Sequence, residues 1–112
     1  MSPRPADALL KRSAPIFAAL GDPTRLHVVA RLSGGGPMSI TQLTEGSDVT
    51  RQAVTKHLVV LADAGLVRGF RQGRERVWEL RTRQLEEAGR VLDLISTRWD
   101  SALERLRALV EG

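Results

Sequence analysis

Residues 41–61 read TQLTEGSDVTRQAVTKHLVVL, and the architecture of the chain can be worked out from this stretch. Thr41 to Glu45 predicts a very short helix, and Gly46-Ser47-Asp48 predicts a turn. Thr50 can then cap a longer helix that runs to about Ala64. A short helix, a tight turn and a longer helix form the helix-turn-helix plan, in which the second helix enters the major groove of DNA.

The longer helix has the two faces that this plan demands. Val54, Leu58 and Leu61 fall at i, i+4 and i+7, so we expect them to point into the core. The other side is mostly polar, and such side chains can bond guanine, adenine, a thymine methyl or a phosphate. A merely solvated polar face remains the alternative. The side chains in question are Arg51, Gln52, Thr55 and Lys56.

A basic hairpin follows this helix directly. Leu66 to Gln72 and Glu75 to Leu80 predict two strands around Gly73-Arg74. Arg71 and Arg76 join Arg74 at the tip, where they could follow the DNA backbone or place an arginine in the minor groove. Charge that protects an edge hairpin from aggregation is the alternative. A hairpin of this kind after a helix-turn-helix predicts a wing.

The DNA-contacting residues that we predict come from the short helix, the longer helix and the wing. His57 is included with two interpretations, a packed histidine or one that bonds a phosphate. His27 is interpreted as structural, and Arg25 stays open between bonding Asp22, contacting phosphate and supporting a dimer. The full set is Thr41, Gln42, Thr50, Arg51, Gln52, Thr55, Lys56, His57, Arg71, Arg74 and Arg76.

Two helices are predicted before the helix-turn-helix. After a loose or weakly helical arm, residues 1–12, Ser13 is expected to cap a helix that has Pro15 in its first turn and ends at Gly21. Asp22 caps the next helix, with Pro23 at its first position. Its core face is predicted as Leu26, Val29, Ala30 and Leu32. Residues 33–37 are expected to form a flexible loop, and residues 38–40 a short extended segment.

The last helix argues for a second copy of the chain. From Thr82 to Val110 it would span roughly 40 Å, more than the core of so small a domain can cover. Its apolar stripe continues along nearly the whole length, so we expect it to pair with the same helix of a partner. A helix that folds back over a monomer core is the alternative. The predicted interface consists of Ile16, Phe17, Leu92, Ile95, Trp99, Leu103 and Leu106.

Charge is concentrated in the central third of the chain. The 112 residues carry a formal charge of +4, and residues 51–83 alone hold eight basic and three acidic side chains. A basic patch of this kind favours a polyanionic partner, with nucleic acid before membrane.

The chain has no cysteine, which excludes disulfides, thiol chemistry and cysteine-bound metal. We find no Walker-type loop, nucleophile elbow or histidine triad, so an enzyme is not expected.

The pattern therefore predicts one mainly helical domain with a small β-hairpin, an α+β winged helix-turn-helix. Its expected parts are the arm (1–12), the helix-turn-helix (39–64), the wing (66–80) and a dimerisation helix (82–110). The absence of a secretory segment and of an 18-residue apolar run predicts a cytoplasmic protein that does not enter a membrane.

Three stretches resemble the ArsR family of winged-helix repressors. They are Ala19-Leu20-Gly21-Asp22-Pro23-Thr24-Arg25-Leu26, the recognition helix with its exit (residues 54–58 and 61–67), and Gly73-Arg74 with Val77-Trp78-Glu79-Leu80. Together they span roughly residues 14–110. The resemblance implies a homodimer built on the first and last helices, and DNA binding that an effector or signal switches off.

Departures from the family pattern argue against a metal site. Members that sense soft metals carry cysteines near the short helix, where this chain has Thr41-Gln42-Leu43-Thr44. Others bind zinc or nickel through Asp and His on the last helix, which here has Asp93 and Asp100 but no histidine. We therefore expect no metal and no cofactor, and the effector stays unknown. Residues 98–106 are similar to a branch without metal ligands, whose members are often autorepressors encoded beside a START-like ligand-binding protein.

The function predicted is a homodimeric, sequence-specific repressor that binds an inverted repeat in double-stranded DNA and could regulate its own gene. Two alternatives belong to other classes: a winged-helix module that binds proteins, and a protein that coats DNA without sequence preference. The exposed polar and basic face favours the first, because a protein-binding module has no need of it.

Overall fold

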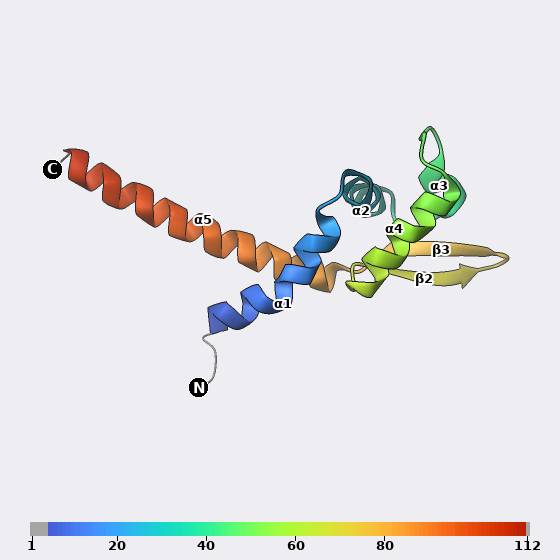
Figure 1. The fold of residues 1–112 in the computed structure, drawn as a ribbon, viewed down its shortest axis with the longest axis horizontal. Helices are drawn as coiled ribbons and strands as arrows, with labels where there is room; N and C mark the ends of the chain where they lie inside the picture. The colour runs from blue at the N-terminus through green and yellow to red at the C-terminus, as the bar shows by residue number, and fades with distance from the viewer. Residues whose placement is uncertain (1–4, 112) are drawn as a thin grey trace.

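The computed structural model describes residues 5–111, and Figure 1 shows the arrangement of its elements. The predicted sequence of helices, helix-turn-helix, hairpin and long helix is confirmed, and the fold is a winged helix-turn-helix. In chain order the elements are α1 (Pro5–Leu20), α2 (Pro23–Gly35), β1 (Met38–Ser39), α3 (Ile40–Thr44), α4 (Arg51–Asp63), β2 (Val67–Gln72), β3 (Glu75–Leu80) and α5 (Thr82–Glu111).

Side-chain caps explain where the central helices begin. The Asp22 carboxylate accepts a hydrogen bond from the backbone N–H of Arg25 at 3.0 Å, and the Thr50 hydroxyl accepts one from Ala53 at 3.1 Å. Each bond satisfies an N–H that has no partner within its own helix. Both predicted caps are therefore confirmed.

Three antiparallel strands form the sheet, in the order β1-β3-β2. The hairpin closes through a two-residue turn at Gly73 and Arg74, as predicted, and Gly73 has a φ of +65°, which glycine adopts without steric cost. The pairing of β1 with the central strand β3 is an addition to the predicted hairpin, with Met38 opposite Trp78 and Ser39 opposite Val77.

The core lies between the helices and one face of the sheet. Leu58, Leu61 and Leu66 are completely buried, and apolar side chains of α1, α2, α3 and α5 pack around them. The predicted inward face of α4 is confirmed, because Val54 is buried together with Leu58 and Leu61. This anchoring leaves the opposite side of α4 facing outward.

The first helix begins earlier than predicted. Residues 5–12 are helical, so Ser13 and Pro15 lie inside α1 and the predicted cap at Ser13 is wrong. The early residues pack beside α5, where Leu9 and Arg12 share a groove with Leu94. Packing of this kind stabilises a helix beyond its local start signals. The rest of the predicted arm, residues 1–4, lies outside the described residues.

The second helix buries a different face from the one predicted. Val28, Val29 and Leu32 are buried, whereas Leu26 and Ala30 are exposed, so the predictions for these two residues are wrong. The helix also continues to Gly35, three residues into the predicted loop. Ile40, predicted to be extended, is the first residue of α3.

The last helix is long and largely uncovered. In Figure 1, α5 passes α1 and then extends away from the other elements. Only Ala88 and Val91 of its 30 residues are buried, while the molecule reaches 66 Å along its longest axis. None of the helices within residues 5–111 combines the length and apolar character that a membrane crossing requires.

Candidate nucleic-acid interface

The residues of α4 that are predicted to contact DNA bases lie at the start of the helix and face solvent. Arg51, Gln52, Thr55 and Lys56 are exposed, and Thr50 precedes them as the cap. The Thr55 hydroxyl donates to the backbone carbonyl of Arg51 at 2.8 Å, so its proton is already used, while its methyl group and its acceptor lone pairs are left for an outside contact. The helical periodicity predicted that these side chains face outward, and their exposure confirms that prediction.

The short helix α3 is fastened to both its neighbours. The Ser39 hydroxyl accepts a hydrogen bond from the Gln42 backbone, and the Gln42 side-chain oxygen accepts one from the Ser39 N–H at 2.9 Å. This capping box uses the carbonyl of Gln42 and leaves its amide NH₂ for other partners. The Arg51 guanidinium donates to the Thr41 hydroxyl at 3.3 Å, which joins the first turn of α3 to the first turn of α4.

The base of the wing carries matched charges. Arg68 and Glu79 lie opposite each other across the hairpin, and the guanidinium donates to the carboxylate at 2.6 Å. Arg68 also lies 5.1 Å from the centre of the Phe70 ring. An opposite-charge pair directly across two strands stabilises a hairpin.

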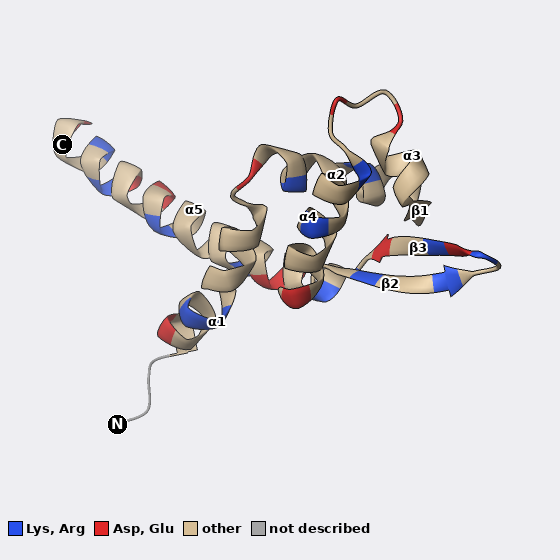
Figure 2. Cartoon of the chain, turned by 45° about the vertical axis from the view of Figure 1, so that its right-hand side comes forward, with Lys and Arg blue, Asp and Glu red and all other residues tan. Residues whose placement is uncertain are grey.

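The tip of the wing carries like charges instead. Arg71 lies directly opposite Arg76, and both are exposed. Arg74 in the turn adds a third cation, and none of the three forms an ion pair within residues 5–111. Figure 2 shows Lys and Arg at the free end of the hairpin. Like charges in register destabilise a strand pair, so this tip favours a bound polyanion.

A groove joins the wing to the helix-turn-helix. It has a volume of about 210 Å³ and is lined from the helical side by Thr41 and Arg51, and from the wing by Arg74, Glu75 and Arg76. Predicted contact residues that lie more than 30 positions apart in the sequence therefore share one surface. Three guanidinium groups against one carboxylate leave the groove positively charged.

Comparisons with known proteins point to one family. A family model described as a helix-turn-helix domain matches residues 20–69. The chain is 39% identical over 96 residues to the transcriptional regulator Rv2034 of Mycobacterium tuberculosis, covering 86% of each. A solved ArsR-like transcriptional regulator from Rhodococcus sp. RHA1 matches at 33% identity with a TM-score of 0.71, over 88% of this chain and 92% of that one.

The chain belongs to the ArsR family. The family consists of DNA-binding transcriptional regulators, not of enzymes. The chain is also 27% identical to the arsenical resistance operon repressor of Escherichia coli over 97 residues, which are 87% of this chain and 80% of that protein. The resemblance seen in the sequence is thereby confirmed.

His57 of this ArsR-family chain faces the start of α2. Its Nδ1 atom lies 3.2 Å from the Arg25 guanidinium and 3.8 Å from the Asp22 carboxylate. Arg25 is further held by a 2.6 Å bond to the carbonyl of Ala19. Hydrogen bonding from the Arg25 backbone lowers the pKa of Asp22, and nearby positive charge contributes. The packed interpretation of His57 describes this geometry, and the open role of Arg25 becomes that of a link between α1, α2 and α4.

The predicted dimer residues of the ArsR-family chain divide into two groups. Ile16 is 3% exposed and belongs to the core of a single chain, so it offers no surface to a partner. Phe17 is half-buried against that core. The residues of α5 are all exposed: Leu92, Ile95, Trp99, Leu103 and Leu106.

Among residues 5–111 no group of three His, Asp or Glu side chains comes close enough to hold a metal ion.

Proposed function

We propose that this ArsR-family protein is a homodimeric repressor that binds an inverted-repeat operator. The observation that carries the proposal is the unmatched charge of Arg71 and Arg76 at the wing tip, beside the exposed start of α4. A hairpin that keeps two arginines in register loses stability when it is free. Phosphate groups of DNA neutralise such charges on binding and release counterions.

The two parts of the surface would have different tasks. Gln52, with Arg51 and Lys56, would contact base edges in the major groove, where Gln pairs with adenine and Arg or Lys with guanine. The arginines of the wing would contact the backbone, which fixes position without reading sequence. Thr41 and Gln42 of α3 and the cap Thr50 would contact phosphates beside the recognition helix. His57 has the least access among the predicted contacts, since its ring is already engaged by Arg25.

The proposed dimer follows from the uncovered stripe of α5. Trp99 is 63% exposed, and the apolar residues before and after it along the helix are exposed as well. A second copy packed two-fold against this stripe would bury both stripes together. Such a dimer would place two α4 helices about one DNA turn apart, which matches an inverted repeat. The proposed parts are the helix-turn-helix (39–64), the wing (66–80) and the dimerisation helix (82–110), acting in the cytoplasm on DNA.

The test is a selection from random double-stranded DNA, followed by fluorescence anisotropy over a salt series. The DNA upstream of the protein's own gene is measured alongside, because the proposal includes regulation of that gene. We expect a selected inverted repeat that saturates at one dimer per site and binds more tightly than its scrambled form. Equal binding to both would instead identify a coating protein. Absence of DNA binding would identify a protein-interaction module.

A further inference from the structure

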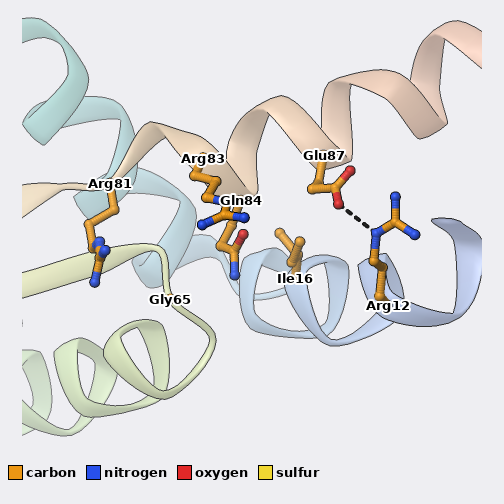
Figure 3. A pocket seen from close by; sticks show the side chains of 7 residues that line it. All are labelled: Arg12, Ile16, Gly65, Arg81, Arg83, Gln84 and Glu87. Carbon is orange, nitrogen blue, oxygen red and sulfur yellow. Dashed lines mark hydrogen bonds and ion pairs between the residues drawn. The ribbon is translucent and has the colours of Figure 1, made fainter.

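A second basic site lies away from the groove beside the wing. A cavity of about 330 Å³ lies between α1, the turn after α4 and the beginning of α5, and Figure 3 shows the residues that line it. Three arginines, one glutamine and one glutamate provide its polar lining, and Ile16 is the apolar side chain among its lining residues. This volume is at the lower end of the range for small-molecule pockets.

The single carboxylate in the cavity is already neutralised. One oxygen of Glu87 accepts from Arg12 at 2.6 Å, and the other accepts from Arg90 at 2.7 Å. The hydrogen bond from Arg12 is the main reason that the pKa of Glu87 is lowered. Figure 3 shows this ion pair at one end of the cavity. Glu87 is therefore engaged by Arg12 and Arg90, and it forms no ion pair with Arg81 or Arg83.

The other two arginines are unmatched. Arg81 and Arg83 form no ion pair within residues 5–111, and both line the cavity. Gln84 lines the cavity beside them, and its side chain packs closely against the backbone of Gly65 in the turn after α4. A Cβ atom on Gly65 would come within 2.9 Å of the Gln84 amide nitrogen. Gly65 also has a φ of +76°, so this approach depends on glycine. The cavity thus gathers two guanidinium groups and a side-chain amide.

We propose that this cavity binds a small organic anion through a phosphate or carboxylate group held by Arg81 and Arg83. Guanidinium groups bind both groups with paired, charge-assisted hydrogen bonds. DNA is excluded as the occupant by position, because the cavity lies beyond the C-terminal end of α4. The exposed start of α4 is about 20 Å away along the helix axis. An anion in the cavity would touch α1, the beginning of α5 and the turn that follows α4.

The test is a titration of the full chain, labelled with nitrogen-15, followed by NMR. Inorganic phosphate is one probe and citrate the other, with ionic strength held constant by sodium chloride. We expect saturable shifts centred on the backbone amides of Gly65, Arg83 and Gln84. Tighter binding of phosphate would indicate a phosphate ester as the natural ligand, and tighter binding of citrate a polycarboxylate.

Matched variants separate this site from general charge effects. Arg83→Gln is expected to weaken binding about tenfold, the usual effect of losing one charge-assisted hydrogen bond, and Arg81→Gln serves as a second variant. Arg107→Gln removes the same charge at the far end of α5 and should leave affinity unchanged. Absence of saturation with both probes would overturn the proposal, as would equal weakening by Arg107→Gln. The readout needs no DNA, so it is independent of the proposed repressor function.

Discussion

Two cross-strand pairs in the wing show how single residues separate stability from function. Arg68 and Glu79 at the base form an ion pair, whereas Arg71 and Arg76 near the tip place like charges opposite each other. The same hairpin therefore supports the fold at one end and loses stability at the other. We infer that the tip is built for a partner that supplies negative charge.

Gln52 is the residue at which sequence specificity can be tested most directly. Gln52→Ala is expected to weaken binding to the selected site by about 1–3 kcal/mol and to relax preference at one base position. Fluorescence anisotropy against the selected site and single-base variants of it measures both effects. Ser101→Ala, at an exposed position of α5 outside both proposed sites, is the control and should leave DNA affinity unchanged. Equal losses on selected and scrambled DNA would contradict a base-reading role.

Arg74 tests the contribution of the wing. Arg74→Ala is expected to weaken binding to all sequences and to reduce the slope of log affinity against log salt by about 1, because one phosphate contact is lost. Arg107→Ala, at the distal end of α5, removes a charge from another exposed surface and is the matched control. A slope that stays unchanged in Arg74→Ala would remove the wing turn from the interface.

The exposure of a site residue could be predicted where the helical periodicity alone determines it. It was predicted less well where contacts with distant parts of the chain determine it. Gln52 and Lys56 lie on the outer face of α4 because its core side is fixed by Val54 and Leu58. His57 lies at the border between the two faces, so its partner on α2, 32 residues away, could not be found from spacing. Ile16 is apolar in either role, and only the packing shows that it belongs to the core of one chain.

At the scale of single elements, the cap of the recognition helix provides a test. Thr50→Ala removes the acceptor for the Ala53 N–H and is expected to lower the free energy of unfolding by about 1 kcal/mol. Urea denaturation followed by circular dichroism measures the change. Thr50→Ser keeps the acceptor and should restore stability, and Thr97→Ala on α5 is the control for loss of a threonine. Unfolding that Thr50→Ala leaves unaltered would contradict the capping role.

The link between α1 and α5 predicts a dependence on pH. The pKa of Glu87 in the folded chain is lowered from 4.5, mainly by Arg12, so its carboxylate contributes stability above that value. This contribution is lost as the pH falls through the lower, folded pKa. We expect Glu87→Gln to reduce the fall in unfolding free energy between neutral pH and about pH 3.

The control for this experiment is the neighbouring glutamate. Glu86 is exposed and forms no ion pair within residues 5–111, so Glu86→Gln should retain the pH dependence of the original chain. Urea denaturation of all three proteins over the same pH range provides the measurement. If both variants lost the same part of the pH dependence, the Arg12–Glu87 contact would not be its source.

Local signals located most elements but did not decide every face or boundary. The caps at Asp22 and Thr50 and the turn at Gly73 act over a few residues, and all three are confirmed. The start of α1 depends on packing against α5, a contact between distant parts of the chain, and Ser13 resembles a cap only locally. In α2 the apolar residues between 26 and 32 surround most of the helix, so periodicity alone did not select the buried face.

At the scale of the whole molecule, the proposed dimer depends on the exposed stripe of α5. Trp99→Arg places a charge in the middle of this stripe and is expected to convert dimers into monomers, since an unmatched charge is costly in an apolar interface. Sedimentation velocity measures the change directly. Affinity for the inverted repeat should fall in the same variant, because each monomer would bind one half-site alone.

Ser101→Arg is the matched control for the dimer. It introduces the same side chain on the opposite side of α5, two residues and about 200° further round the helix. This variant should sediment like the original protein. A dimer that persists in Trp99→Arg would show that the second copy binds through another surface.

Ser39 has a consequence for how the molecule fits DNA. It pairs with Val77 on the central strand and also caps α3, so the wing and the helix-turn-helix meet at one short segment. A bound duplex would then meet a template of fixed shape, and the base steps between the two contacts would have to bend to it. Flexible steps accept such bending at lower energy than stiff ones. We therefore expect the operator to show base preferences at positions that no side chain touches.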